Sequence, residues 1–280
     1  MILFKSVAEL NTHIQMARAG GLSIGFVPTM GALHQGHISL IDYSRNQNSL
    51  TVSSIFVNPT QFNNPLDFQK YPVTLEQDID LLEKWGCDIL FMPAKDEIYP
   101  PGFKSPHYDL GYLETILEGK YRPGHFQGVC QVVDRLLEIV RPNRLYLGQK
   151  DYQQCMVLKK LVELTGMDTH IEVCPTLREA DGLAMSSRNL RLNPSQRELA
   201  TTIYQNLAYL KENLQKGPLG QLKQEVRSNL VAAGFKVDYA EIADANTLEL
   251  LESWDGKQKT VALVAAYLDD IRLIDNLPLS

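Results

Sequence analysis

The sequence predicts an α/β fold: a Rossmann-like parallel sheet domain followed by a smaller α+β C-terminal domain with antiparallel strands. Through the first 175 residues, short apolar or β-branched runs alternate with longer helical patterns, as in a parallel sheet wrapped by crossover helices. Beyond residue 176, helical segments precede two apolar runs separated by Asp269-Asp270, which predicts a hairpin and antiparallel pairing. We therefore expect one domain at 1–175 and a second at 176–280.

Five short apolar runs predict the strands of the first domain. Between them, apolar residues recur at intervals of three and four, which predicts helices. The expected strands are 22–27, 50–57, 88–92, 144–147 and 170–174, and the expected helices lie near 37–47, 74–85, 126–140 and 151–165.

The second domain is expected to be a small α+β lid. Pro194 opens a long helical segment, Pro218 restarts one, and Gly234 stops it, in keeping with the preference for proline at helix starts and glycine at helix ends. Strands are expected at 237–242, 260–268 and 271–273.

Composition excludes several classes of protein. The chain has 280 residues, of which 44% are apolar and 21% charged, as in ordinary globular proteins. Its formal net charge of -6 offers no broad basic surface and disfavours a nucleic-acid binder. No run approaches ~18 consecutive apolar residues, and the amino terminus lacks a signal-peptide pattern, so no membrane association is expected and the localisation is predicted to be cytoplasmic. The four cysteines are widely separated, which predicts buried reduced thiols.

Polar side chains follow four of the five predicted strands, where ligands bind in open parallel sheets. They lie at 28–37, 58–62 and 148–151, and at Arg178 with 185–189. We expect these groups to converge on one ligand site.

The segment His34-Gln35-Gly36-His37 is expected to bind phosphate. Gly31 and Gly36 allow the backbone to approach a ligand closely, and a helix starting near His34 would aim free N–H groups and its positive dipole end at an anion. His34 and His37, three residues apart, would point at the same spot and donate to a triphosphate as charge builds on the leaving group. Metal binding and simple helix packing are the alternatives, but no zinc-type ligand spacing accompanies the pair.

Further donors for phosphate are expected from Lys150 and from a loop containing Ser186, Ser187 and Arg188. Taken singly, a lysine at a strand end is usually a solvated charge, and a Ser-Ser-Arg-Asn run is usually a turn. Their joint placement after strands supports the nucleotide hypothesis. The Rossmann glycine fingerprint and the P-loop are both absent from the sequence.

Four blocks of the chain resemble the pantothenate synthetase family, part of the HIGH-motif nucleotidyltransferases related to class I aminoacyl-tRNA synthetases. The blocks are 28–37, 56–62, 148–154 and 178–189, and their order and spacing fit over essentially the whole chain. The resemblance implies that (R)-pantoate attacks ATP to give pantoyl adenylate and pyrophosphate, and that β-alanine then displaces AMP to give pantothenate. It also implies a homodimer.

The resemblance further implies roles for individual residues. His37 would act as an acid-like donor, with His34, Lys150 and Arg188 as its catalytic companions. Gln61 and Gln154 would bind pantoate, and Gln61 would also face β-alanine. The residues implied to bind ATP are Met30, Gly31, Ala32, Leu33, His34, Gln35, Gly36, His37, Gly148, Gln149, Lys150, Asp151, Leu177, Met185, Ser186, Ser187 and Arg188.

Magnesium is expected because two histidines and a lysine cannot offset the charge of a pyrophosphate leaving group. Asp78 best resembles the family's metal-proximal acid, although a carboxylate early in a helix often only complements the helix dipole. Gln149 replaces the family's usual Glu, and the role of that position is left open. The block at 121–128, with Arg122 and His125, also matches the family, without an assigned role.

Two rival functions are left by the sequence. One is a HIGH-group nucleotidyltransferase that transfers AMP or CMP to a phosphorylated acceptor. The neutral side chains of Gln61 and Gln154 argue against it, because such an enzyme would need additional cations for the acceptor phosphate. The other is a nucleotide-sensing or scaffold protein that has kept the site but lost catalysis.

Overall fold

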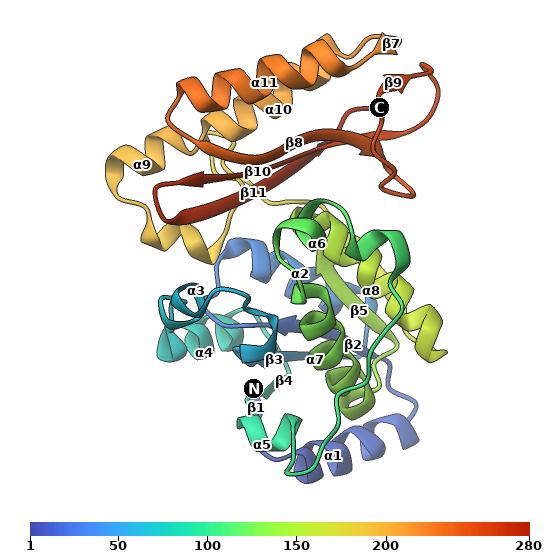
Figure 1. Cartoon of the computed structure of the whole chain (residues 1–280). Helices are drawn as coiled ribbons and strands as arrows, with labels where there is room; N and C mark the ends of the chain where they lie inside the picture. Colours follow the sequence, from blue (N-terminus) through green and yellow to red (C-terminus); the bar gives the residue numbers. More distant parts are fainter. The chain divides into compact units, whose positions relative to one another are not determined.

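The computed structural model describes residues 1–280 (Figure 1). The chain forms two compact units, the first comprising 1–149 and 153–175 and the second comprising 150–152 and 176–280. Residues 150–152 pack with the later part of the chain: the Tyr152 hydroxyl donates to the Ala245 carbonyl at 2.6 Å. The lid role expected of the second domain remains a prediction.

A six-stranded parallel sheet forms the centre of the first unit, in the order β1-β4-β3-β2-β5-β6. The five predicted strands are present, but the count of five was wrong, because β1 pairs with β4 from Ile2↔Ile89 onward. A strand of three residues is too short to show a period. The strands are β1 (Ile2–Phe4), β2 (Ile24–Thr29), β3 (Leu50–Ile55), β4 (Ile89–Phe91), β5 (Arg144–Gly148) and β6 (His170–Cys174).

Helices cover both faces of this sheet, and alternating strand residues contact them. Phe26 and Leu145 lie in one buried cluster with residues of α1 (Val7–Ala19), α7 (His125–Val140) and α8 (Tyr152–Thr165). Their neighbours Val27 and Tyr146 lie in another, with residues of α2 (Gln35–Gln47) and α4 (Leu75–Lys84). Both faces are therefore buried, which explains the nearly continuous apolar runs of the strands.

Four of these helices, α2, α4, α7 and α8, confirm the helices predicted from periodicity. Helix α1 was not predicted, although Ser6 caps its first turn by accepting from the Glu9 backbone N–H at 3.4 Å. The shorter segments are η1 (Pro59–Gln61), α3 (Pro65–Gln69), α5 (Lys95–Ile98), η2 (Gly111–Glu114), α6 (Leu117–Tyr121) and η3 (Gln149–Asp151).

The second unit contains a three-stranded antiparallel sheet in the order β11-β10-β8. The predicted hairpin is confirmed: Leu268 pairs with Ile271, and Asp269 adopts a left-handed φ of 52°, as a tight two-residue turn requires. The strands are β8 (Lys236–Asp244), β10 (Thr260–Leu268) and β11 (Ile271–Pro278), with β7 (Gly217–Pro218) and β9 (Ser253–Trp254) in a small separate sheet.

Two helices, α10 (Thr202–Asn213) and α11 (Gly220–Ala232), share an apolar cluster with one side of that sheet. The predicted helix start at Pro218 was wrong by two residues, because Gly217 and Pro218 pair with β9 before α11 begins. Helix α9 (Pro194–Leu199) does begin at Pro194, and the short η4 (Ser187–Arg191) precedes it.

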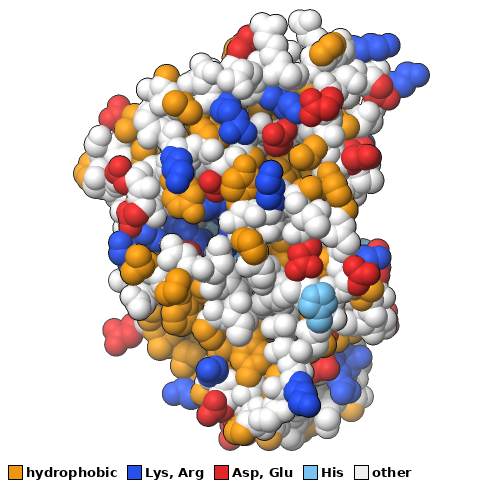
Figure 2. All heavy atoms as spheres, in the orientation of Figure 1, with side chains coloured by type: hydrophobic (Ala, Val, Ile, Leu, Met, Phe, Trp, Pro, Cys, Tyr) orange, Lys and Arg blue, Asp and Glu red, His pale blue; other side chains and the backbone are white.

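The molecular surface agrees with the charge composition. Lys and Arg side chains intermingle with Asp and Glu side chains on the face shown in Figure 2. None of the helices is long and apolar enough to cross a membrane. Cys87, Cys130, Cys155 and Cys174 are buried free thiols, as predicted.

Candidate active site

The loop between β2 and α2 (residues 30–34, the β2–α2 loop) starts with a left-handed turn. Gly31 has φ 81° and Ala32 has φ 50°. The first of these conformations suits glycine, but the second is disfavoured for a residue with a Cβ atom. The Thr29 hydroxyl accepts from the Gly31 backbone N–H at 3.2 Å, so the turn is tied to the end of β2.

His34 and His37 form a capping box at the start of α2. Nδ1 of His34 accepts from the Gly36 N–H at 3.1 Å, and Nδ1 of His37 accepts from the His34 N–H at 3.3 Å. The ring centroids are 4.1 Å apart. Because each Nδ1 acts as an acceptor, a neutral ring carries its proton on Nε2. The two histidines therefore combine helix capping with two N–H donors of fixed tautomer.

The capping box corrects the expectation that backbone N–H groups would point freely at phosphate. The backbone N–H groups that donate within the protein are those of Gly31, Ala32, Leu33, His34, Gly36 and His37. Most backbone donors of this segment are therefore committed within the protein, which makes the imidazole rings candidate donors to an anion.

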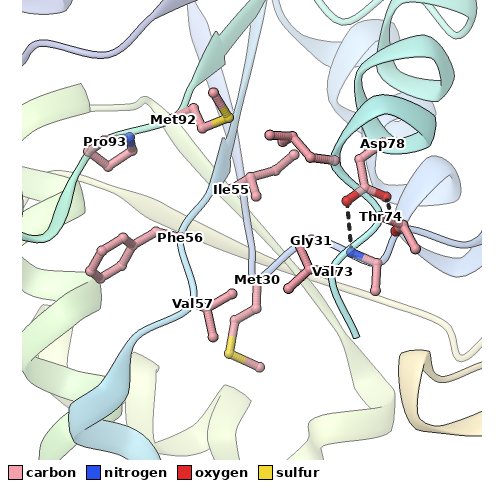
Figure 3. Close-up of a pocket in the computed structure, with 12 residues that line it drawn as sticks. Met30, Gly31, Ile55, Phe56, Val57, Val73, Thr74, Asp78, Met92 and Pro93 are labelled. Carbon is pink, nitrogen blue, oxygen red and sulfur yellow. Dashed lines mark hydrogen bonds between the residues drawn. The ribbon is translucent and has the colours of Figure 1, made fainter. Parts of the chain in front are cut away.

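Asp78, in the first turn of α4, is 2% exposed. Its Oδ2 atom accepts from the Ala32 N–H at 2.9 Å (Figure 3). Its Oδ1 atom accepts from the Leu33 N–H at 2.8 Å. Oδ1 also accepts from the Thr74 hydroxyl at 3.0 Å. The structure thus gives this carboxylate a contact with the β2–α2 loop that the sequence did not predict. Its proximity to a metal remains a prediction.

A cavity of about 190 Å³ lies beside the same loop. The close-up in Figure 3 shows that its walls come from the ends of β2, β3 and β4 and from the start of α4. Most of the lining is apolar, with Asp78 at one edge. The lining residues are Met30, Gly31, Ala32, Ile55, Phe56, Val57, Val73, Thr74, Leu75, Asp78, Met92 and Pro93.

Gln61 lies at the end of η1, and both the nitrogen and the oxygen of its side-chain amide are hydrogen-bonded. Its Nε2 atom donates to Met30 Sδ at 3.1 Å, and its Oε1 atom accepts from Asn58 Nδ2 at 3.2 Å. The η1 segment also packs closely against α7. A Cβ atom added at Gly128 of α7 would lie 2.7 Å from the Gln61 Cα, so only glycine fits there. Gln61, which is predicted to bind pantoate, therefore contacts Met30, the first residue of the segment predicted to bind ATP.

His125 holds the backbone of Gln61. Its Nδ1–H donates to the Gln61 carbonyl at 2.7 Å, and its Nε2 atom accepts from Arg122 Nη1 at 3.0 Å. A guanidinium can only donate, so these contacts fix the Nδ1–H tautomer. Arg122 also pairs with Glu118 at 3.3 Å. This network gives Arg122 and His125, which had no predicted roles, a place beside Gln61.

Gln154 lies on the first turn of α8 and is half-buried. Its neighbour Gln153 is buried and has a structural role that the sequence did not reveal. Gln153 Nε2 donates to the carbonyls of Leu113 and Ile116, while its Oε1 accepts from the Glu118 N–H at 2.9 Å. Gln153 therefore anchors the segment around η2 and α6 against α8.

Lys150 lies in the second unit and is fixed through its backbone. Its carbonyl accepts from Asn276 Nδ2 at 2.8 Å, and its Nζ atom lies 3.8 Å from Asp151 Oδ2. The Asn276 carbonyl in turn accepts from Arg178 Nη2 at 3.0 Å. Asn276 of β11 is thus hydrogen-bonded both to Lys150 and to Arg178, which belong to two of the predicted polar segments.

Arg178 was grouped with the polar side chains expected to face the ligand, but its guanidinium is committed to a structural contact. It pairs with Asp275 through two hydrogen bonds of 2.6 and 3.0 Å. Its Cζ atom stacks 4.4 Å from the centre of the Tyr204 ring. This finding corrects the expectation for Arg178.

The predicted phosphate loop at 185–188 is closed by local hydrogen bonds. The Met185 N–H donates to the Leu177 carbonyl at 3.1 Å, and the Arg188 N–H donates to the Ser186 hydroxyl at 3.3 Å. Ser187 is buried. The ATP contacts assigned to this loop, to Gln149 and to Lys150 remain predictions.

The family model for pantoate-beta-alanine ligase matches residues 2–278. The chain belongs to this family. Among its relatives, the pantothenate synthetase of Cytophaga hutchinsonii is 44% identical over 99% of both chains. The family model thus covers both units, including the β2–α2 loop, Gln61 and Lys150.

Solved structures of the family have the same fold. The pantothenate synthetase of Thermus thermophilus superposes with a TM-score of 0.91 at 40% identity, covering 100% of this chain and 99% of that one. The pantoate-beta-alanine ligase of Francisella tularensis, complexed with beta-gamma ATP and beta-alanine, gives a TM-score of 0.81 at 40% identity over 100% and 98%.

Proposed function

We propose that this chain catalyses the ATP-dependent condensation of (R)-pantoate with β-alanine to give pantothenate, AMP and pyrophosphate. The observation that carries the proposal is the pair of Nε2–H donors fixed by the His34–His37 capping box, in a loop whose Met30 contacts Gln61. The names of the family members and the ligands named for the Francisella tularensis structure support the same chemistry.

The first step forms pantoyl adenylate. A carboxylate oxygen of pantoate attacks the α-phosphorus of ATP, and the bond from that phosphorus to the bridging oxygen breaks to release pyrophosphate. The Nε2–H groups of His34 and His37 would donate to the phosphate oxygens on which charge builds. Lys150 and Arg188 would add positive charge, and their placement at the phosphates is part of the proposal.

Neutral amides suit the attacking carboxylate. An arginine would stabilise the anion in the ground state and make it a poorer nucleophile, whereas Gln61 and Gln154 would orient it at lower cost. Gln61 is already positioned by Asn58 and Met30. It needs little reorganisation to bind a substrate, which favours a productive geometry.

The second step forms the amide. The neutral amine of β-alanine attacks the acyl carbon of the adenylate, the acyl–phosphate oxygen bond breaks, AMP leaves, and the nitrogen loses a proton. Because Gln61 contacts the β2–α2 loop through Met30, we propose that it faces both pantoate and the incoming amine.

Magnesium would accompany ATP, yet the chain offers no obvious ligand set for a resident ion. There is no group of three or more His, Cys, Asp or Glu residues that could hold a metal, and the Asp78 oxygens accept from two backbone amides and a hydroxyl. We therefore propose that Mg²⁺ enters on the nucleotide phosphates, as is common for this ion. Its role is to offset phosphate charge.

One assay tests the proposal. The protein is mixed with ATP, Mg²⁺ and pantoate, pyrophosphate is followed, and β-alanine is then added while AMP is followed. We expect pantoate-dependent pyrophosphate and β-alanine-dependent AMP. Absence of pantoate-dependent pyrophosphate would refute the proposal, and nucleotidyl transfer to a phosphorylated acceptor would favour the rival transferase. Light scattering tests the proposed homodimer separately.

A further inference from the structure

The turn at Gly31 and Ala32 needs support from outside the loop. Ala32 is buried and has φ 50°, a conformation that is disfavoured for L-residues and persists where surrounding contacts impose it. Gly31 is equally constrained, since a Cβ added there would lie 3.1 Å from Asp78 Oδ2 and 3.2 Å from Ile55 Cγ2. The loop is therefore fitted closely around the carboxylate.

Asp78 supplies that support from an element more than 40 residues away in the chain. Its two oxygens accept from the consecutive amides of Ala32 and Leu33, at 2.9 and 2.8 Å. Hydrogen bonds to an ionised acceptor are stronger than neutral ones. Two such bonds on successive peptide units restrict the rotation of both.

The surroundings strengthen these bonds. The carboxylate is itself 2% exposed and lies beside a cavity lined mainly by apolar residues, among them Ile55 and Leu75. Polar contacts are stronger in a low-dielectric environment, and leaving one unmade there costs more. The Thr74 hydroxyl, which donates to Oδ1 at 3.0 Å, fixes the orientation of the carboxylate.

We propose that Asp78 is a positioning residue that sets the geometry of the two catalytic histidines. By holding the N–H of Leu33, it fixes the residue that precedes the N-cap His34, and through the capping box it fixes His37. This inference rests on the proposed function. It assigns to Asp78 a mechanical task that is distinct from binding magnesium.

The two tasks compete for the same atoms. Oδ1 already accepts two hydrogen bonds, and Oδ2 accepts one and lies close to Gly31. Direct coordination to an ion with strict octahedral geometry would require the carboxylate to turn away from the amides. A positioning role therefore predicts that loss of the carboxylate changes catalysis without changing the magnesium requirement.

The test compares Asp78→Asn with Asp80→Asn, a matched substitution at an exposed residue of the same helix. An Asn amide has one acceptor oxygen, and its NH₂ group would face a backbone N–H. We expect Asp78→Asn to speed hydrogen exchange in the peptide containing Ala32 and Leu33. We also expect it to lower kcat/KM for ATP by roughly 10- to 100-fold, as small misplacements of reacting groups do. Asp80→Asn should change neither.

Magnesium titration separates the two roles. In the positioning role, the Mg²⁺ concentration for half-maximal activity stays within about twofold of wild type. A tenfold or larger increase, with turnover restored at high Mg²⁺, would overturn the proposal in favour of a metal ligand. Unchanged exchange at Ala32 and Leu33 would overturn it as well.

A second variant covers the case in which Asp78→Asn fails to fold. Thr74→Val removes only the hydroxyl that orients the carboxylate, and we expect the same changes on a smaller scale, about threefold to tenfold in kcat/KM for ATP. Unchanged exchange and kinetics would overturn the proposal. If wild type forms no pantoate-dependent pyrophosphate, the proposed function is refuted. Hydrogen exchange needs no substrate, so it still tests the contact between Asp78 and the β2–α2 loop in that case.

Discussion

Nδ1 of His37 accepts a hydrogen bond from the backbone N–H of His34 at 3.3 Å. This bond ties the second histidine to the cap residue of the same helix, so one contact stabilises the helix start and selects the tautomer that places a proton on Nε2. In the proposed mechanism, folding and chemistry therefore depend on the same two rings. A substitution at either position changes both unless the new residue can still cap the helix.

Asparagine at position 34 should separate the two roles. Asn is among the best N-cap residues, so His34→Asn should keep the unfolding free energy within about 0.5 kcal/mol of wild type. It lacks the Nε2–H donor, and turnover should fall roughly 10²- to 10³-fold, as for other lost transition-state donors. His34→Ala should lose turnover and also about 1 kcal/mol of stability. Denaturant unfolding and pyrophosphate release measure both. Turnover of His34→Asn near wild type would contradict a donor role.

Substitutions at His125 test whether its hydrogen bond to the Gln61 carbonyl matters for pantoate binding. His125→Ala removes the donor to the Gln61 carbonyl, and we expect KM for pantoate to rise about tenfold because the loss of one hydrogen bond costs about 1–1.5 kcal/mol. Asn at 125 can place an amide N–H near the position of Nδ1, so His125→Asn should stay within about threefold of wild type. Steady-state kinetics with pantoate varied give the comparison. Equal defects in both variants would mean that the contact to Gln61 is not what matters.

The sequence predicted that the segments after β2 and β3 would meet, but not which contacts hold them in place. Residues after parallel strands share one edge of a sheet, so Met30 and Gln61 could be placed together from the strand pattern alone. The bonds from Asp78 to the β2–α2 loop join segments more than 40 residues apart, and no local period encodes such a contact. The missed strand β1 has the same explanation, since its three residues gain their structure by pairing with β4.

Gln154 tests whether a neutral amide is needed at the pantoate carboxylate. We expect Gln154→Arg to retain or lower KM for pantoate, because a cation binds the carboxylate, while single-turnover adenylation slows, because the nucleophile is stabilised. Gln154→Leu serves as the control that removes all polar contact and should raise KM. Faster adenylation by Gln154→Arg at unchanged Mg²⁺ would count against the argument.

Breaking the pair Arg178–Asp275 should destabilise the second unit. Both side chains are largely buried and share two hydrogen bonds, and loss of one partner leaves the other charge unpaired. Arg178→Met is expected to cost about 3–5 kcal/mol. The double variant Arg178→Met with Asp275→Leu should recover much of that loss, which denaturant unfolding would reveal as a favourable coupling energy. Additive losses would show that the pairing is not the cause.

Asp134, on α7, should make stability depend on pH. Burial raises the pKa of its carboxyl, with the Glu138 charge acting in the same direction, while the hydrogen bond from Tyr108 and the charge of Arg135 act in the opposite one. The Tyr108 hydroxyl donates to Oδ2 at 2.6 Å, and Oδ1 is buried without a partner. The carboxylate is therefore harder to ionise in the folded protein than in the unfolded chain.

The sign of the effect follows from proton linkage. A folded-state pKa above the unfolded value of about 3.9 means that the folded protein binds more protons between the two values, so stability falls as pH rises through that window. Asp134→Asn abolishes this titration and can still accept from Tyr108. We expect its unfolding free energy to increase relative to wild type between about pH 3 and pH 7, measured by urea unfolding at fixed ionic strength. The control Asp80→Asn replaces an exposed carboxylate. If its unfolding free energy increased over wild type by the same amount in this pH range, this account would be refuted.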